Sequence, residues 1–380
     1  MFAQGFQLIL IAMSMFYWYV ANTQYKLPIF FKGLNVLLLL FTIYGVAVII
    51  ENPTWARHGT QTFLKQVYKS LLPIYAFYVF AKRGQFTIKK LKFWYIVFFG
   101  LVVRSYYLED ARLSLVIEES GTDYTALTNN AAYRFVGVLP GLVLFRKKPV
   151  IQYLLIAVSS YFLISGMKRG AILCGAVCLV WFVFSNYKAA NNRQRRIILI
   201  VTVAVIILGV FYVNYMLETS NFFQHRVEQT KEGDSSNRDY IYGSLWQHFL
   251  NEENIFRAVF GNGVYSTVRF IGTPAHNDWL EIMTGQGVLG VFIYVIYWVC
   301  FYITWRRSRR CPEAFMIIGM TLICYFLSSC FSMSYDSMSR SAGMTLGFAL
   351  ASMYGRNLFV EETSESSVGA IECRADQDMA

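Results

Sequence analysis

Polar side chains able to do acid–base chemistry gather at the start of one apolar run, in the stretch PAHNDWLEIMTGQGVLG that begins at residue 274. His276 can take a proton from a hydroxyl group or, as imidazolium, hold an anion. Glu281 is the alternative base, because a carboxylate at an apolar boundary is desolvated and retains its proton more readily. Asn277 and Asp278 are predicted to contact the same substrate. The structural alternative is helix capping, since Asp278 and Glu281 have the spacing of a capping box.

Two cations lie together in a short turn, SGMKRGA, between two apolar segments. Arg169 offers a planar fork of donors that suits a phosphate group, and Lys168 adds a second positive charge. These two residues are therefore predicted to form an anion site. The alternative is that both side chains reach back to the phosphates of the lipid headgroups.

Two further arginines are candidates for the same chemistry. Arg134 falls about one turn inside an apolar segment, where an ionisable side chain is a functional candidate by default. Its structural alternative is a buried ion pair with Glu109 or Asp110. Arg238 begins the segment RDYIYGSLWQHFLNEE, where by itself it would be an ordinary solvated charge.

Neither a metal site nor a cofactor site is predicted. The sequence contains no His-Glu-x-x-His pattern and no glycine-rich phosphate loop. Its one Asp-x-Asp pair, Asp376 and Asp378, lies in the C-terminal tail, away from the polar cluster.

The elements that must position these residues are membrane helices. Of 380 residues, 56% are hydrophobic and 15% are charged, and the mean hydropathy is +0.41, as in an all-α polytopic membrane protein. About eleven transmembrane helices are predicted. They cover Phe2–Ala21, Gly33–Ile50, Val67–Ala81, Phe93–Leu108, Asn130–Phe145, Val150–Ser165, Ala171–Asn186, Ile197–Leu217, Trp279–Trp305, Ala314–Met333 and Ser341–Gly355. The ninth would be about 40 Å long, against a hydrocarbon core of about 30 Å, so its polar start lies at headgroup depth.

Basic residues alternate between the two sides of the predicted spans. Eighteen lie in five alternate loops, whereas seven lie in the opposite short loops and the adjoining span ends. The eighteen are Lys26, Lys32, Lys82, Arg83, Lys89, Lys90, Lys92, Arg146, Lys147, Lys148, Lys188, Arg193, Arg195, Arg196, Arg306, Arg307, Arg309 and Arg310. By the positive-inside rule these loops are cytoplasmic and the N-terminus lies outside. The net charge of +11 is explained by this topology, and no nucleic-acid partner is predicted.

One long soluble segment separates two groups of helices. Residues 1–217 would hold the first eight spans, residues 218–278 an external loop with short helices, residues 279–358 the last three spans, and residues 359–380 a disordered cytoplasmic tail. The loop contains a predicted amphipathic helix, Arg238–Glu253. Its apolar stripe would comprise Ile241, Leu245, Trp246, Phe249 and Leu250. A Gly-Asn-Gly turn follows at 261–263.

The order SGMKRGA, SSNRDYIYGSLW, GNGVYS and PAHNDWLEIMTGQGVLG resembles the O-antigen ligase and polymerase superfamily. The resemblance covers roughly residues 125–305. It implies an integral membrane glycosyltransferase of the GT-C type with one large periplasmic loop, in the bacterial inner membrane. By motif, Arg169, Arg238 and His276 occupy the family's essential basic positions. Members usually have about twelve spans and a cytoplasmic N-terminus, from which the predicted topology departs.

The resemblance also implies the reaction and the partners. The substrates would be undecaprenyl-diphosphate-linked glycans, as donor and as acceptor, reached from the surrounding membrane lipid. Arg169 and Arg238 would bind the donor's diphosphate, and fixed cations would replace a divalent metal. A sugar hydroxyl would attack the anomeric carbon with inversion, oriented or deprotonated by His276 with support from Glu281. A flippase and a chain-length regulator of the same pathway are expected partners.

Three functions compete at this stage. The favoured one is a polymerase of repeat units for O-antigen, capsule or exopolysaccharide, because the loop is short and the motif reads His-Asn-Asp. A ligase would instead transfer the finished chain to lipid A-core in lipopolysaccharide. A transporter or flippase is less favoured, because internal repeats and paired broken helices are not visible in the sequence.

Overall fold

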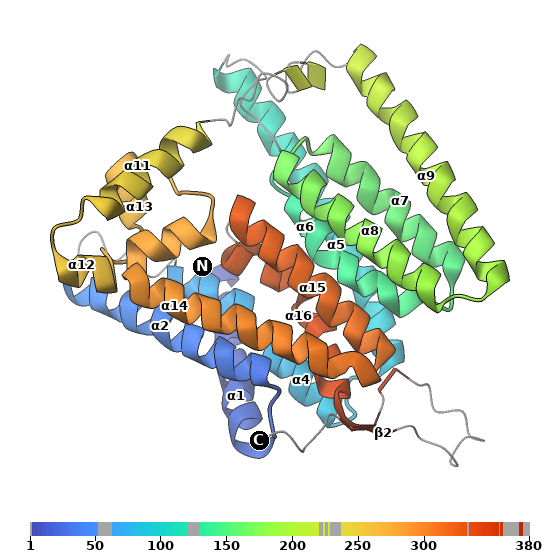
Figure 1. The fold of residues 1–380 in the computed structure, drawn as a ribbon, viewed down its shortest axis with the longest axis horizontal. Coiled ribbons are helices and arrows are strands. Elements are labelled where there is room, and N and C mark those ends of the chain that lie inside the picture. Colours follow the sequence, from blue (N-terminus) through green and yellow to red (C-terminus); the bar gives the residue numbers. More distant parts are fainter. Residues whose placement is uncertain are drawn as a thin grey trace. The chain divides into compact units, whose positions relative to one another are not determined.

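The computed structural model describes residues 2–51, 63–120, 129–219, 223–224, 227–228, 237–332, 334–356, 358–359 and 372–374. Helices dominate these residues (Figure 1). The two short strands, β1 (Tyr354–Arg356) and β2 (Glu372–Arg374), pair antiparallel. The predicted all-α class is therefore confirmed. The chain divides into two compact units, of which unit 1 contains residues 1–92 and 238–380 and unit 2 contains residues 93–237.

Unit 1 is assembled from both ends of the chain. Its elements are α1 (Phe2–Gln24), α2 (Ile29–Glu51), a helical stretch at 63–71, α4 (Pro73–Lys82), α11 (Arg238–Leu250), α12 (Ile255–Phe260), α13 (Ser266–Ile271), α14 (Asp278–Arg307), η3 (Ser308–Arg310), α15 (Pro312–Phe331) and α16 (Ser334–Ser352). The first residues of α5 (Ile88–Ser120) also belong to it.

Helices α2 and α14 lie side by side and antiparallel in unit 1, although they are far apart in the sequence (Figure 1). The amide of Phe30 donates to Thr304 Oγ1 at 2.9 Å, which joins the start of one helix to the end of the other. A side chain at Gly33 would meet Cys300 Cβ at 2.9 Å, so the glycine lets the two backbones approach closely. This pairing positions the start of α14, where the polar cluster lies.

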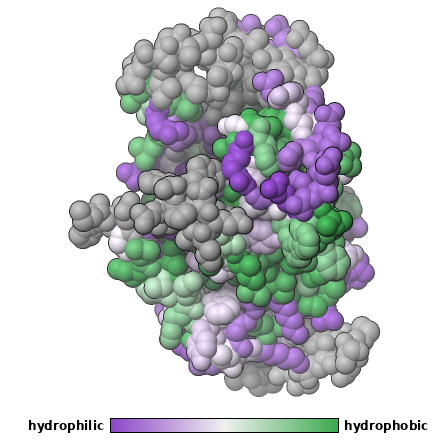
Figure 2. Space-filling model, turned by 90° about the vertical axis from the view of Figure 1, so that its left-hand side faces the viewer, coloured by the Kyte–Doolittle hydropathy of each residue, from purple (hydrophilic) through white to green (hydrophobic). Residues whose placement is uncertain are grey.

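The outer face of this pair is apolar. Leu39 and Ile43 on α2 and Phe292 on α14 are more than half exposed. On this side of unit 1, Figure 2 shows a broad band of hydrophobic residues with hydrophilic residues gathered above and below it. Such a band would be unstable in water and suits the hydrocarbon core of a bilayer.

Unit 2 is built around aromatic contacts. It contains most of α5, then α6 (Ala132–Val138), the 3₁₀ helix η2 (Leu139–Phe145), α7 (Pro149–Ser165), α8 (Arg169–Ala189) and α9 (Asn192–Thr219). The rings of Phe135 and Phe162 stack at 4.7 Å between centroids, and the Tyr95 hydroxyl donates to the Val138 carbonyl at 2.8 Å. Asn129 Oδ1 accepts from the amide of Ala131 at the approach to α6.

Seven of the described helices are long and apolar enough to cross a membrane. They correspond to Gly5–Gln24, Ile29–Ala47, Ile88–Leu115, Arg169–Lys188, Asn192–Thr219, Asp278–Arg310 and Pro312–Phe331. Three shorter apolar stretches, Ala132–Phe145, Pro149–Ser165 and Ala342–Ser352, fall where further spans were predicted. The structure is that of a polytopic membrane protein; the count of eleven and the orientation stay predictions.

Some boundaries differ from those predicted. The third predicted span is divided at Pro73, which begins α4 because proline suits the first turn of a helix. Helix α5 continues to Ser120, beyond the predicted end at Leu108. Within the tail predicted to be disordered, Glu372–Arg374 forms β2, and most of the remainder lies outside the described residues.

Candidate functional site

The helix at the centre of the site begins where the sequence predicts, but a different residue caps it. Helix α14 starts at Asp278, and Asn277 Oδ1 accepts from the amides of Trp279 and Leu280 at 2.9 and 3.2 Å. The N-cap is thus one residue earlier than in the predicted capping box, because Asn277 has the extended backbone that a cap requires. The Asn277 amide nitrogen also donates to the Cys330 carbonyl at 3.2 Å, which ties the cap to the end of α15.

His276 lies directly before this cap, in a strained backbone conformation. Its φ is +52°, in the left-handed region that few non-glycine residues adopt. Its side chain is exposed, while Ala275 before it is fully buried. Ala275 is buried on one side of His276 and the Asn277 cap lies on the other, so the backbone of this turn is held in place while His276 itself is exposed.

Glu281 holds this turn from within α14. Its Oε1 accepts from the amide of Ala275 at 2.6 Å, and its Oε2 accepts from Thr267 Oγ1 on α13 at 2.8 Å. The carboxylate is 9% exposed and Thr267 is fully buried. Both carboxylate oxygens are therefore engaged in structural hydrogen bonds. This geometry favours a role in positioning His276 over direct proton transfer.

Asp278 faces the interior. Its side chain is fully buried, and its Oδ2 accepts at 2.9 Å from the hydroxyl of Tyr294, which lies 16 residues further along the chain. The aromatic ring of Trp279 packs against Tyr294 with ring centroids 4.8 Å apart. Asp278 thus braces the first turns of α14 from inside.

Helix α14 is broken at Gly287, and this break was not predicted from the sequence. Gly287 has φ +66°, so α14 consists of two helical segments. The break leaves the carbonyls of Thr284 and Gly285 without helical partners, and the amides of Asn262 and Gly263 donate to them at 2.9 Å each. The predicted Gly-Asn-Gly turn is thereby locked onto the first segment of α14.

Glycines are required on both sides of this junction. A side chain at Gly261 would lie 2.4 Å from the backbone of Gly285, and one at Gly287 would lie 2.4 Å from the Val259 carbonyl. Gly261 has φ +78°. The sequence signal for the break was the pair of glycines in TGQG; the role of Thr267 as partner of Glu281 had no signal.

Arg238 is the first residue of α11, and that helix is anchored to the start of α14. Ile241, Leu245 and Ala275 form a buried apolar cluster, with Leu280 packed against it. Arg238 is half-buried, and no described residue forms an ion pair or hydrogen bond with its side chain. Through this cluster, α11, which begins at Arg238, packs against the turn that carries His276.

The predicted amphipathic stripe of α11 is only partly buried. Ile241 and Leu245 are buried, whereas Trp246 is 50% and Leu250 is 63% exposed. The helix ends at Leu250, before the predicted Glu253. The packing of α11 against the turn before α14 therefore rests on Ile241 and Leu245.

The predicted cations of unit 2 occupy a similar local structure. Lys168 is the N-cap of α8 and Arg169 is its first residue; both are half-buried and both have interaction partners. Met167, directly before them, has φ +51°. Gly166 lets this turn approach α6, since a side chain there would meet Ala132 Cβ at 2.7 Å.

Arg134 is exposed on α6, although its neighbours Tyr133 and Phe135 are buried. Glu109, its predicted alternative partner, forms an ion pair with Arg112 at 3.0 Å. Among the described residues no ion pair joins Arg134 to a carboxylate. Arg134 thus presents a free guanidinium at the surface of unit 2.

A shared feature marks three of these positions. Within the described ranges, four non-glycine residues have positive φ: Met167, Asn237, Tyr265 and His276. Met167 directly precedes the predicted Lys168–Arg169 pair, Asn237 directly precedes Arg238, and the third is His276 itself. Each of these basic groups also stands at the N-terminus of a helix, where the helix dipole disfavours a cation by roughly 0.3–1 kcal/mol and favours an anion. Strained turns that place cations at helix N-termini are suited to binding anionic groups.

The described helices are those of a polytopic membrane protein, and its predicted basic residues stand at or directly before helix N-termini. Residues 154–295 match the family described as O-antigen ligase, and this segment includes Arg169, Arg238, His276 and Glu281. No match to a curated protein was found. This match supports the resemblance to the O-antigen ligase/polymerase superfamily that the motifs predicted. Members of this family are glycosyltransferase-like enzymes that act on lipid-linked glycans.

Proposed function

We propose that this protein is a polymerase that joins undecaprenyl-diphosphate-linked repeat units into O-antigen, capsule or exopolysaccharide at the outer face of the bacterial inner membrane. The observation that carries the proposal is the set of left-handed turns that hold Arg169, Arg238 and His276 at helix N-termini. A diphosphate leaving group is the anion that such positions would serve. The family match supports the same class of substrate.

In the proposed reaction, the hydroxyl oxygen of one repeat unit attacks the anomeric carbon of another. A new C–O bond forms as the bond from that carbon to the diphosphate breaks, with inversion. The hydroxyl proton passes to His276, and the electron pair leaves with undecaprenyl diphosphate. Arg238 stabilises the charge that develops on the diphosphate. Arg169 presents the same chemistry, and we assign it a phosphate of a lipid-linked substrate.

Glu281 has a positioning role in this scheme. Its hydrogen bonds to Ala275 and Thr267 keep the turn of His276 in its strained conformation. The exposed imidazole is then held at the boundary between the apolar helix and the external turn, where a lipid-linked acceptor would arrive. His276 therefore needs no large movement to reach a sugar hydroxyl.

The proposal is tested with purified protein in lipid vesicles. Synthetic repeat units on an undecaprenyl-diphosphate carrier are supplied without lipid A-core. We expect products of several repeat units, and we expect Arg238→Ala to form none while Glu253→Gln, an exposed charge change nearby, behaves as wild type. If no longer product forms and single units are instead transferred to added lipid A-core, the chain is a ligase and the polymerase assignment is wrong.

A further inference from the structure

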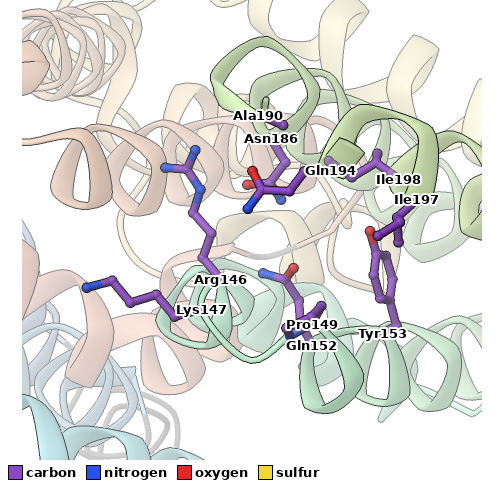
Figure 3. Close-up of a pocket in the computed structure, with 10 residues that line it drawn as sticks. All are labelled: Arg146, Lys147, Pro149, Gln152, Tyr153, Asn186, Ala190, Gln194, Ile197 and Ile198. Atoms are coloured by element: carbon purple, nitrogen blue, oxygen red, sulfur yellow. The ribbon is translucent and has the colours of Figure 1, made fainter. Parts of the chain in front are cut away.

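A pocket with polar and apolar walls lies in unit 2 at the opposite end of α7 and α8 from Arg169 (Figure 3). It forms where α7 begins, α8 ends and α9 begins, and its volume is about 190 Å³. From Arg169 to Asn186 the axis of α8 rises by about 26 Å at 1.5 Å per residue. The pocket is therefore separate from the anion-binding turn at Arg169. Its lining residues are Arg146, Lys147, Pro149, Gln152, Tyr153, Asn186, Ala190, Gln194, Ile197 and Ile198.

One side of the pocket carries a cation without a partner. Arg146 is half-buried, and no described residue hydrogen-bonds or pairs with its guanidinium group. In Figure 3, Arg146 rises along one side of the pocket, whereas Lys147 extends away from Gln152 and Gln194. Arg146 thus offers its fork of donors to a phosphate group at the pocket.

The facing side carries a buried acceptor that lacks a donor. Asn186 is 8% exposed, and its Oδ1 is buried with no hydrogen-bond partner among the described residues. Of the nearby side-chain amides, Gln152 Nε2 donates to the Leu142 carbonyl at 2.9 Å and Gln194 Oε1 accepts from the backbone amide of Asn191 at 3.3 Å, and neither side chain donates to Asn186 Oδ1. A buried acceptor that is left unpaired destabilises the fold, so a ligand that brings a donor to Asn186 would be stabilising.

Apolar side chains near the pocket, on α7 and α9, are left exposed by the described residues. Ile197 at its rim is 45% exposed, and Leu154 on α7 and Ile200 on α9 are 62% and 67% exposed. None of the residues of α9 is buried, although this helix is the most hydrophobic of the candidate spans. A ligand with a polar head in the pocket and apolar chains would cover these surfaces.

We propose that this pocket binds the headgroup of a glycerophospholipid. The phosphate would lie against Arg146, a donor on the headgroup would reach Asn186 Oδ1, and the acyl chains would run along α7 and α9. The arrangement selects a headgroup with a phosphate beside a hydrogen-bond donor, such as phosphatidylethanolamine. Phosphatidylcholine carries the same phosphate and the same net charge, but its quaternary ammonium cannot donate to Asn186.

The experiment is native mass spectrometry of the purified full chain, titrated with these two lipids carrying identical acyl chains. On the unchanged protein, phosphatidylethanolamine is expected to bind about tenfold or more tightly than phosphatidylcholine, the loss expected for one hydrogen bond from a charged donor. Asn186→Leu, which keeps the side-chain volume, is expected to remove this preference. The comparison of two lipids on wild type needs no variant, so it decides even if Asn186→Leu does not fold.

A charge-matched pair of variants separates the pocket from general attraction of lipids. Arg146→Gln should weaken binding of both lipids by about tenfold or more, because the fork to the phosphate is lost. Lys147→Gln removes the same charge from a side chain directed away, and its binding should stay within about twofold of wild type. Equal binding of the two lipids by wild type, or equal losses in the two charge variants, would overturn the proposal. Displacement of the lipid by millimolar inorganic phosphate would also overturn it and assign the pocket to free phosphate.

Discussion

The role of Glu281 gives the sharpest prediction, because a positioning residue and a general base respond differently to substitution by glutamine. In the structure Glu281 accepts one hydrogen bond from the amide of Ala275 and one from Thr267 Oγ1. A glutamine at 281 can satisfy both partners. Its Oε1 accepts from the amide of Ala275, and its Nε2 donates to the Thr267 hydroxyl, which can accept as well as donate.

The magnitudes differ enough to decide. Glutamine loses only the charge assistance of the two bonds, on the order of 1 kcal/mol, or about fivefold in activity. Alanine leaves a buried amide and a buried hydroxyl unpaired, at about 1–3 kcal/mol each, so the turn of His276 loses its fixed conformation and activity is lost. If Glu281 were the general base, glutamine would cost ~10²–10⁴-fold, as much as alanine.

The assay is the initial rate of polymer formation by purified Glu281→Gln and Glu281→Ala, each normalised to the monodisperse protein recovered after size-exclusion chromatography. Glu253→Gln, an exposed carboxylate outside the site, is the matched control. We expect Glu281→Gln to keep about a fifth of wild-type activity. A glutamine variant that folds as well as wild type and is as inactive as Glu281→Ala would refute the positioning role and make Glu281 the base.

Three further predictions concern the turns of the site. Arg238→Ala and Arg169→Ala should each abolish polymer on a glycan gel while the amount of protein in the membrane stays unchanged. Lysine at either position should restore only part of the polymer, since an ammonium lacks the bidentate fork of a guanidinium. Full polymer in either alanine variant would remove that residue from the site. His276→Gly relaxes the left-handed backbone at φ +52°, yet should lose ~10²–10⁴-fold in rate if the imidazole is the base. An active glycine or glutamine variant would show that no base acts there. Gly287→Ala should lower the thermal unfolding temperature sharply, because its new Cβ would lie 2.4 Å from a backbone carbonyl of α12. Gly209→Ala, in open space on α9, should leave the unfolding temperature unchanged. Equal unfolding temperatures for the two variants would contradict the close approach of α12 to Gly287.

Much of the fold followed from the sequence because its signals are local. Long apolar runs indicated the helices, and proline or a polar residue marked most of their starts. The order of short motifs around Arg169, Arg238 and His276 predicted the family resemblance that the match over residues 154–295 supports. The Asn277 cap lay within one residue of the prediction, since Asn and Asp are both good caps and only the backbone conformation decides between them.

The contacts that shape the site were not predictable, because they join residues distant in the chain. The break at Gly287 depends on the amides of Asn262 and Gly263, which donate to the carbonyls of Thr284 and Gly285 only once the fold has formed. Nothing in the sequence distinguishes Thr267 from other loop residues, and its hydrogen bond to Glu281 forms only when α13 packs beside α14. The burial of Asp278 against Tyr294 likewise depends on packing inside the bundle, so composition alone left it among the candidates for substrate contact.

The most direct test of the central claim is the glycan that cells make when this chain is deleted. Deletion of a polymerase leaves the ligase of the pathway intact, so single repeat units are still transferred to lipid A-core. We predict lipopolysaccharide that runs as core plus one unit, with the long ladder missing and restored by the wild-type chain but not by Arg238→Ala. In a host that makes capsule, the same account predicts loss of high-mass polymer and accumulation of single lipid-linked units. Bare core together with full-length chains on the undecaprenyl carrier would contradict it, because that is the pattern of a missing ligase.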